Sequence, residues 1–302
     1  MRSLSLSAEQ EEFAATVTAT VERFGGGMTT GGDRLWRELG DTGLLGLGTS
    51  DVGGDAIDLI SGMRAAGAAG CQGPFLGAIL GSRILPDLAT AVVAGAVHVS
   101  LVADGVAAWA AGADAFVEVA GGGASLVEVV SARPFETLAR EPWARVEVRP
   151  IERLTLAPPD LAVVQLARAA WIVGAGRAAI DRSAAHARNR RQFGRAIGDF
   201  QAVAHQLAEA AAEIGAAWDV VVVAAWRLEL NADTRAADAA ADAATRAGLI
   251  AAYASHQVHG ALGFTLEAGL DRLSTGIRQM SLHPPSPAAR TEAGPIMTGG
   301  RL

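Results

Sequence analysis

The stretch that decides the fold is Arg190-Arg191-Gln192-Phe193-Gly194, which is followed by Phe200-Gln201 and, further along the chain, by Gln257-Val258-His259-Gly260-Ala261-Leu262-Gly263-Phe264. Each string stands near the end of a long alanine-rich segment whose apolar residues recur at helical spacing. At such helix ends, free backbone groups and an arginine can meet a phosphorylated ligand. The strings therefore predict a binding surface where long helices end.

The composition around these strings is that of a folded globular protein. Hydrophobic residues make up 50% and charged residues 19% of the 302 residues, which excludes a disordered chain. The formal net charge of −7 argues against a nucleic-acid partner, which requires concentrated basic surface. The single cysteine, Cys71, cannot form an internal disulfide, which fits a reducing compartment. We expect it to be a small packed side chain and not a nucleophile.

No segment predicts a membrane span. The longest apolar runs, such as residues 218–226, are interrupted by Asp219 and fall short of the roughly 20 residues that a bilayer requires. The N-terminus lacks the basic-then-apolar pattern of a signal peptide and opens with an amphipathic helix. We therefore expect a soluble, cytoplasmic protein.

Changes in apolar periodicity divide the chain into four segments. Residues 1–91 predict an N-terminal helical domain, in which Ser7 can cap the first helix. Residues 92–157 alternate apolar and polar side chains between glycine-rich turns, which predicts a small antiparallel β domain. Residues 158–282 return to helical spacing with short links, as in an antiparallel bundle of three or four long helices. Residues 283–302, with four prolines, predict an extended or disordered tail.

This domain order resembles the acyl-CoA dehydrogenase family of flavoenzymes, and the resemblance covers nearly the whole chain. Its most specific signs are Arg190-x-Gln192-Phe193-Gly194 and Gln257-x-x-Gly260-x-x-Gly263-Phe264, in this order and at family-like spacing. The fold class that it implies is α+β, mostly α. An N-terminal helical domain precedes a small β domain, which looks shortened here, and a C-terminal four-helix bundle.

The resemblance also implies the cofactor FAD. In the family, the ADP half of FAD lies across a dimer interface and is held by the neighbouring subunit's bundle. Six residues of this chain match positions that hold it: Arg190, Gln192, Phe193, Gln201, Gln257 and Gly260.

Each of these positions has an implied role. Arg190 would pair with the pyrophosphate, which suits a guanidinium, and Gln192 and Phe193 would line the same groove. Gln201 would hydrogen-bond the dinucleotide. Gln257 and Gly260 would meet the adenosine end, where glycine lets the backbone come close. Taken singly, Arg190 also fits a solvated helix end, and Phe193 also fits plain core.

The catalytic positions depart from the family's pattern. The family keeps its glutamate base at one of two places, and by the resemblance these hold Val164 and Pro284, neither of which can accept a proton. The arginine that the family often keeps beside the first place, for the substrate, matches Gln165. No catalytic residue is therefore expected, and the substitutes within reach are His283, beside the second place, and Glu292 in the tail.

Other titratable residues of the bundle lack a pattern typical of a site. Asp233, Asp238 and Asp242 fit an exposed helix face. No metal site is expected, because the bundle histidines have no acids at ligand spacing: His186, His205, His256 and His259.

The chain keeps the residues that match the ADP-holding positions but lacks a base at the positions where the family keeps its glutamate. This combination favours a non-catalytic subunit. We expect it to pair with a second, catalytic acyl-CoA dehydrogenase subunit, similar to the α2β2 enzymes that actinobacteria use on steroid-derived CoA thioesters, and to serve the dehydrogenation of an acyl-CoA. The partner would supply the glutamate. One alternative is a self-sufficient homo-oligomeric dehydrogenase with Glu292 or His283 as its base. Another is a flavin-free interaction scaffold.

Overall fold

The computed structural model describes residues 5–25 and 28–284, so that Glu292 lies outside the described residues. The N-terminal part holds the helices α1 (Ala8–Arg23), α2 (Met28–Asp41), η1 (Leu44–Gly46), α3 (Ala56–Ala68), α4 (Phe75–Ile84) and α5 (Ala89–Val93). Ser7 caps α1 as predicted, because its Oγ accepts the Gln10 backbone N–H at 3.3 Å and its own N–H donates to the Gln10 side chain at 3.0 Å.

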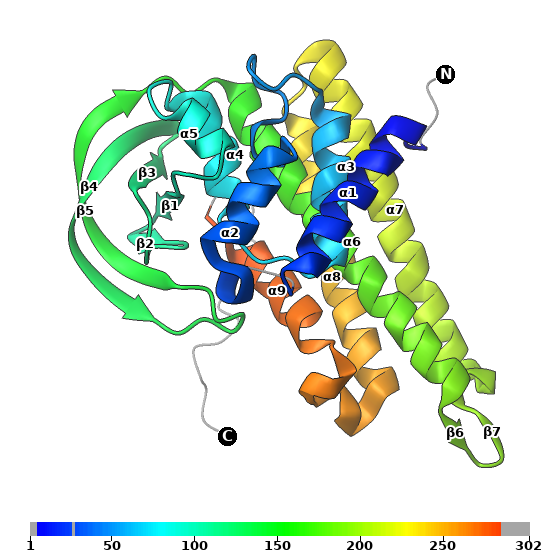
Figure 1. Ribbon diagram of the computed structural model, residues 1–302. Helices are drawn as coiled ribbons and strands as arrows, with labels where there is room; N and C mark the ends of the chain where they lie inside the picture. Colours follow the sequence, from blue (N-terminus) through cyan, green and yellow to red (C-terminus); the bar gives the residue numbers. More distant parts are fainter. Residues whose placement is uncertain (1–4, 26–27, 285–302) are drawn as a thin grey trace.

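The β domain is a closed barrel in the strand order β1-β2-β5-β4-β3 (Figure 1). Its strands are β1 (Val99–Ala103), β2 (Val106–Ala107), β3 (Ala115–Ala120), β4 (Gly123–Phe135) and β5 (Trp143–Leu154). The prediction of an antiparallel sheet is wrong at one junction, where β1 and β3 pair in parallel. The intervening β2 and the loop after it carry the chain back to the start of β1, so β3 runs in the same direction. This parallel pair closes the barrel.

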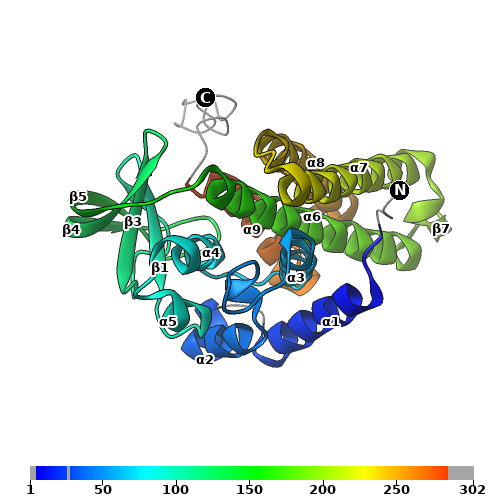
Figure 2. The ribbon, with the colours of Figure 1, turned by 90° about the horizontal axis from the view of Figure 1, so that it is seen from above.

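The C-terminal bundle consists of α6 (Pro158–Asn189), α7 (Gln201–Asn231), α8 (Arg235–His259) and α9 (Asp271–Leu282). Between α6 and α7 lie a two-stranded hairpin, β6 (Arg191–Gln192) and β7 (Arg195–Ala196), and the turn η2 (Ile197–Asp199), while η3 (Gly260–Phe264) and η4 (Leu266–Ala268) join α8 to α9. Figure 2 shows α7 and α8 side by side along one side of α6, with α3 on its other side and the barrel beside its N-terminal end. The predicted fold class, mostly helical with a small β domain and a C-terminal bundle, is confirmed.

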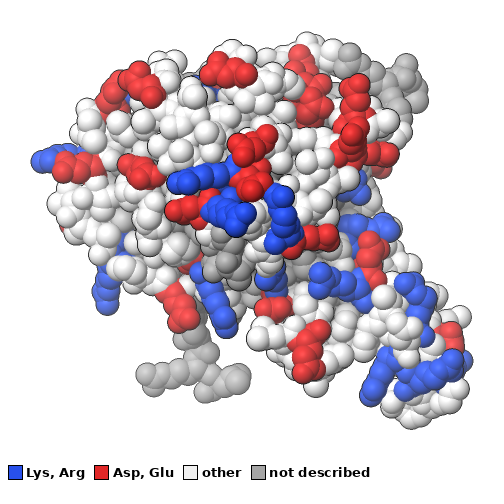
Figure 3. Space-filling view, in the orientation of Figure 1, with Lys and Arg blue, Asp and Glu red and all other residues white. Residues whose placement is uncertain are grey.

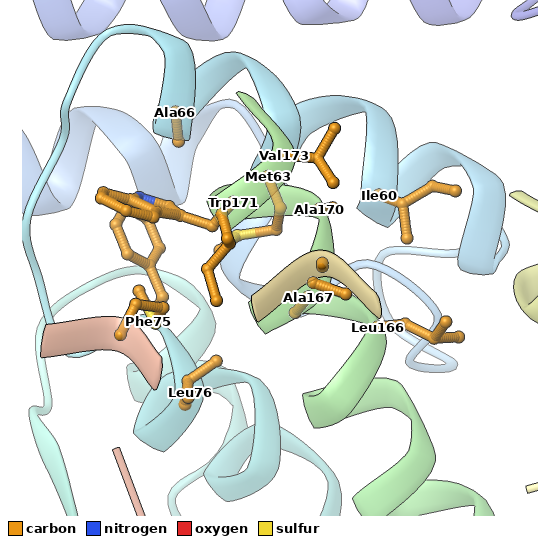
Figure 4. Packing of buried hydrophobic residues seen from close by; sticks show 14 of the residues in the cluster. Ile60, Met63, Ala66, Phe75, Leu76, Leu166, Ala167, Ala170, Trp171 and Val173 are labelled. Carbon is orange, nitrogen blue, oxygen red and sulfur yellow. The ribbon is translucent and has the colours of Figure 1, made fainter. Parts of the chain in front are cut away.

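The main core forms where α6 crosses α3 and α4 (Figure 4). Trp171 is fully enclosed, and its Nε1–H donates to the Cys71 carbonyl at 2.8 Å. Glycines permit the close approach, since a Cβ on Gly174 would lie 2.0 Å from the Arg64 carbonyl oxygen and one on Gly67 would lie 2.0 Å from that of Trp171. Cys71 is buried as predicted, and burial raises the pKa of its thiol to about 12, so it is not a nucleophile.

Contrary to the expectation that no segment could span a membrane, helix α6 is long and apolar enough to do so by length and composition alone. In the fold, however, 83% of its most apolar window is buried inside the protein. The apolar run therefore belongs to the central helix of the core, around which the other bundle helices and α3 pack.

Candidate cofactor-binding site

The β6–β7 hairpin projects from the end of the bundle with Phe193 and Gly194 as its two-residue loop. Both loop residues have positive φ, 51° and 80°, which is the geometry of a type I′ turn. Such turns favour Asn-Gly, because a large side chain in the left-handed region is strained. Phe193 nevertheless stands there with 92% of its surface exposed, so the alternative that it packs in the core is wrong. The turn presents this ring to solvent or to another molecule.

All six predicted cofactor residues lie on the surface at this end of the bundle: Arg190, Gln192, Phe193, Gln201, Gln257 and Gly260. Arg190 is the C-cap of α6, and its carbonyl accepts the Ile197 N–H at 2.8 Å. Gln201 is the first residue of α7, and Gly260 ends α8 with a φ of 59°. The Phe193 ring meets the Phe200 ring edge-on at 6.2 Å.

Two stacked histidines bring the separate parts of this surface together. The rings of His186, one turn before Arg190, and His259, next to Gly260, are stacked at 4.3 Å. His259 Nδ1–H donates to the Ser255 carbonyl at 2.9 Å, which fixes the orientation of its ring. Burial, and then the neighbouring charges of His259 and Arg190, hold the pKa of His186 below its ordinary value. The spacing of these histidines in the sequence does not predict this pairing.

Unpaired positive charge gathers at the same end. Figure 3 shows blue side chains clustered over the hairpin, where four exposed arginines lie: Arg188, Arg190, Arg191 and Arg195. Within residues 5–25 and 28–284, none of the four forms an ion pair with a carboxylate. Helix α7 also begins here without a side-chain cap, so the N–H groups of its first two residues can meet an anion. The arrangement suits a phosphate-bearing ligand.

The two positions that the resemblance assigns to the family's base lie elsewhere, and neither side chain can accept a proton. Val164 is buried in α6, 2% exposed, and Pro284 follows the end of α9. His283, expected at the head of an extended tail, is instead fixed and buried. Its Nε2–H donates to the Glu141 carboxylate at 2.9 Å, and its ring meets Trp143 edge-on at 4.9 Å.

Residues of the barrel and of α6 add further hydrogen bonds to this buried pair. Trp143 Nε1–H also donates to the Glu141 carboxylate, at 2.8 Å, and Arg168 Nη2 donates to the His283 carbonyl at 3.1 Å. His283 and Glu141 side chains are each 3% exposed, so His283 cannot meet a substrate in this arrangement. Glu141, Trp143 and Arg168 are not among the site residues predicted from the sequence. Only Arg168 gave a signal, as the single charged residue between Asp160 and Arg177.

A cavity of about 400 Å³ opens at the opposite end of α6, between its N-terminus, the start of α8 and the turn that joins β3 to β4. Gln165, Asp104 and Asp238 are among the residues that line it. Burial and the neighbouring Asp242 hold the pKa of Asp238 above its ordinary value. Val164 is not among the described residues that line the cavity. Within the described ranges, no three His, Cys, Asp or Glu side chains gather to hold a metal ion.

Comparison with known proteins agrees with the fold. Residues 158–283 match the family model described as acyl-CoA dehydrogenase, C-terminal domain. A stretch of 115 residues, 38% of this chain, is 36% identical to the probable acyl-CoA dehydrogenase YngJ of Bacillus subtilis, of which it spans 30%. The chain thus matches only about a third of that relative's length.

Solved structures match over a larger part of the chain. The steroid acyl-CoA dehydrogenase Tcur3481-Tcur3483, a G363A variant, is similar at a TM-score of 0.78 and 23% identity, over 90% of this chain and 92% of that one. The ChsE4-ChsE5 complex of Mycobacterium tuberculosis is similar at a TM-score of 0.76 and 19% identity, over 93% of this chain and 94% of that one.

The helical domain, barrel and bundle thus define the architecture of an acyl-CoA dehydrogenase. Residues 158–283 belong to the acyl-CoA dehydrogenase C-terminal domain family, and the described chain as a whole has the fold of that family. The resemblance inferred from the sequence is confirmed.

Proposed function

We propose that this chain is the non-catalytic subunit of a heteromeric acyl-CoA dehydrogenase, and that it holds the ADP half of an FAD whose flavin ring reacts in a partner subunit. The observation that carries the proposal is the contrast between the C-terminal end of α6 and the two positions that the resemblance assigns to the base. The C-terminal end presents arginines and an exposed ring, whereas the base positions hold Val164 and Pro284. Two of the similar solved structures are named as two-component assemblies, which supports a partner.

The residues at the bundle end fit the ADP half of FAD. Arg190 would pair with the pyrophosphate, with the uncapped start of α7 at Gln201 beside it. Phe193 would cover the groove, and Gly260, exposed and with positive φ, leaves room for the adenosine. FAD, when bound, accepts the hydride from the β-carbon of the acyl-CoA. The partner's glutamate would take the α-proton.

A self-sufficient dehydrogenase would need a base in this chain. His283 is enclosed and hydrogen-bonded to Glu141, so it would serve only after the segment behind α9 had moved. A flavin-free scaffold would not explain the arginines without carboxylate partners or the exposed Phe193 in its strained conformation. The heteromeric subunit therefore accounts for more of the site than either alternative.

Native purification of the tagged chain from its own host tests the proposal. We expect a second protein to co-purify in equal amount and the pair to contain about one FAD. The complex should dehydrogenate an acyl-CoA, and this activity should depend on a glutamate of the partner. Arg190→Ala should remove most of the FAD from the complex, while Arg37→Ala, an exposed arginine on α2, should leave it unchanged. A colourless complex, or an Arg190→Ala complex with full FAD content, would overturn the proposal. A lone flavinated and active chain would favour the homo-oligomer.

A further inference from the structure

Two imidazole rings join the ends of α6 and α8 at the cofactor-binding end. His186 and His259 are stacked with their ring centroids 4.3 Å apart and their planes inclined by 19°. His186 lies one turn before Arg190, and His259 directly precedes Gly260, so each ring is attached to one half of the surface that we assign to the ADP. The contact between the rings therefore helps to fix how the two halves lie relative to each other.

The surroundings of His259 suit a neutral ring. Its residue is only 9% exposed, and its Nδ1–H donates to the Ser255 carbonyl at 2.9 Å. The Ser183 hydroxyl lies 3.5 Å from the same nitrogen. A neutral imidazole carries one N–H, and here that N–H has its acceptor. A second proton, on Nε2, would place a positive charge inside the stack.

A third histidine extends the cluster towards α9. His256 precedes His259 by almost one turn of α8, and its ring is stacked on Phe264 at 5.0 Å. Its Nε2 lies 3.0 Å from the Ser274 hydroxyl of α9. Three imidazoles from two helices thus share one partly enclosed region, where a charge on one ring acts on the others.

The environment of the cluster opposes its protonation. Burial, then His259 and then Arg190 hold the pKa of His186 below its ordinary value. Burial and then His259 do the same to the pKa of His256, against a smaller opposite effect of the Gly263 backbone. Both shifts have the same sign, so they reinforce each other.

No carboxylate compensates the cluster in the part of the chain that the structure describes. The elements around it bring the exposed His205 on α7 and Arg182 on α6, whose guanidinium donates to the Gly269 carbonyl, while η3 carries no charged side chain. Four acidic residues lie on these elements, and none forms an ion pair with one of the three rings: Asp181 on α6, Asp199 on η2, Glu267 on η4 and Asp271 on α9.

Acidification therefore works against the stack. Separated rings take up protons near about pH 6.5, whereas stacked rings with lowered pKa values take them up only at lower pH. The stacked arrangement thus has its full stability above about pH 6.5 and loses it as the pH falls. A bound pyrophosphate would offset only Arg190, the smallest cause at His186, while cover by the cofactor would add to burial, the largest. Cofactor binding consequently favours neutral rings.

We propose that His186 and His259 are positioning residues of the cofactor-binding surface: as a neutral stack they hold its two halves together, and acidification below about pH 6.5 separates them and releases the cofactor. This inference rests on the proposed function, because FAD is the cofactor that would be released. It adds a regulation to that function, since the complex would keep its flavin at neutral or alkaline pH and lose it in acid.

The pH dependence of FAD retention by the native complex tests this role. After gel filtration at about pH 8 or about pH 5.5, flavin absorbance should show several-fold less FAD in the acid sample. His186→Phe keeps a ring that can stack but cannot take up a proton, so this variant should retain FAD at both pH values. His186→Ala removes the ring and should hold several-fold less FAD even at the higher pH. The control His205→Gln, on an exposed histidine of the same bundle, should lose FAD in acid as the wild type does.

Unfolding of the isolated chain provides a measurement that does not involve FAD. Urea titration followed by circular dichroism should show a loss of stability in acid that is smaller in His186→Phe than in the wild type, and it verifies that each variant is folded. The inference would be overturned, with the proposed function intact, by a wild-type complex that holds as much or more FAD in acid, or by an equal acid loss in His186→Phe. A wild-type complex without FAD at the higher pH would instead overturn the proposed function.

Discussion

At the scale of single residues, Phe193 occupies a position that is unfavourable for local stability but exposes its ring to another molecule. Its backbone occupies a left-handed conformation that costs a bulky residue roughly 1 kcal/mol, and its ring gains almost no burial within the chain. A residue in this situation does not stabilise the isolated fold. Its contribution belongs to whatever covers the ring, which in our proposal is FAD and the partner.

Phe193→Asn separates these two effects. Asparagine suits the first loop position of a type I′ turn, so the isolated chain should keep its stability or gain up to about 1 kcal/mol. The complex should lose FAD several-fold, because the ring over the groove is gone. Thermal melts of the chain and flavin absorbance of the complex measure the two quantities. A destabilised chain with normal flavin content would show that the ring has a purely structural role.

The residues of the candidate site could be predicted because they are close in sequence to helix ends. Arg190, Gln201 and Gly260 are respectively a C-cap, a first residue and a C-terminal glycine, and each role is set locally. The stacking of His186 on His259 could not be predicted, because it joins α6 to α8 across 73 positions of sequence. Pairings of this kind depend on how the helices pack.

At the scale of elements, the close crossing of α3 and α6 depends on glycine at the contact. Gly174 faces the carbonyl of Arg64 with no room for a methyl group, whereas Gly215, on α7, faces open space. The two glycines therefore have opposite consequences for helix stability. A glycine in open helix costs propensity, but a glycine at a crossing permits the packing of a core.

Gly174→Ala should destabilise the chain by about 1–3 kcal/mol, since α3 and α6 must separate to admit the Cβ. Gly215→Ala, the matched control, should stabilise it by about 0.5–1 kcal/mol through better helix propensity. Urea unfolding followed by circular dichroism measures both. Equal effects of the two substitutions would contradict the close crossing.

At the scale of the whole molecule, the barrel and the bundle are joined by groups far apart in sequence. Glu141 lies just before β5, and His283 just after α9, yet their side chains meet in a shared buried site with Trp143. Periodicity predicted the helical and β segments, because each depends on local spacing. It could not predict this contact, the parallel β1–β3 pair or the cavity, all of which arise only when the parts assemble.

Glu141→Ala should destabilise the chain by about 3 kcal/mol, because it leaves the Trp143 and His283 N–H groups buried without an acceptor. Glu147→Ala is the control: this exposed glutamate of β5 accepts a hydrogen bond from Ser131, and its loss should cost less than about 0.5 kcal/mol. The free energy of unfolding of each variant, measured by urea titration, gives the two losses of stability to compare. A loss as small as that of the control would mean that the buried pair does not join the two parts.

The length of α6 also limits how this chain can change during evolution. Helix α6 carries the wall of the cavity at one end, the contact with α3 in the middle and Arg190 at the other end. A single inserted or deleted residue within it would rotate everything beyond that point by about 100° around the axis. Such a change would turn Arg190 and the β6–β7 hairpin away from their present side of the bundle. Insertions and deletions in related chains should therefore be confined to the loops, with the number of residues in this helix held constant.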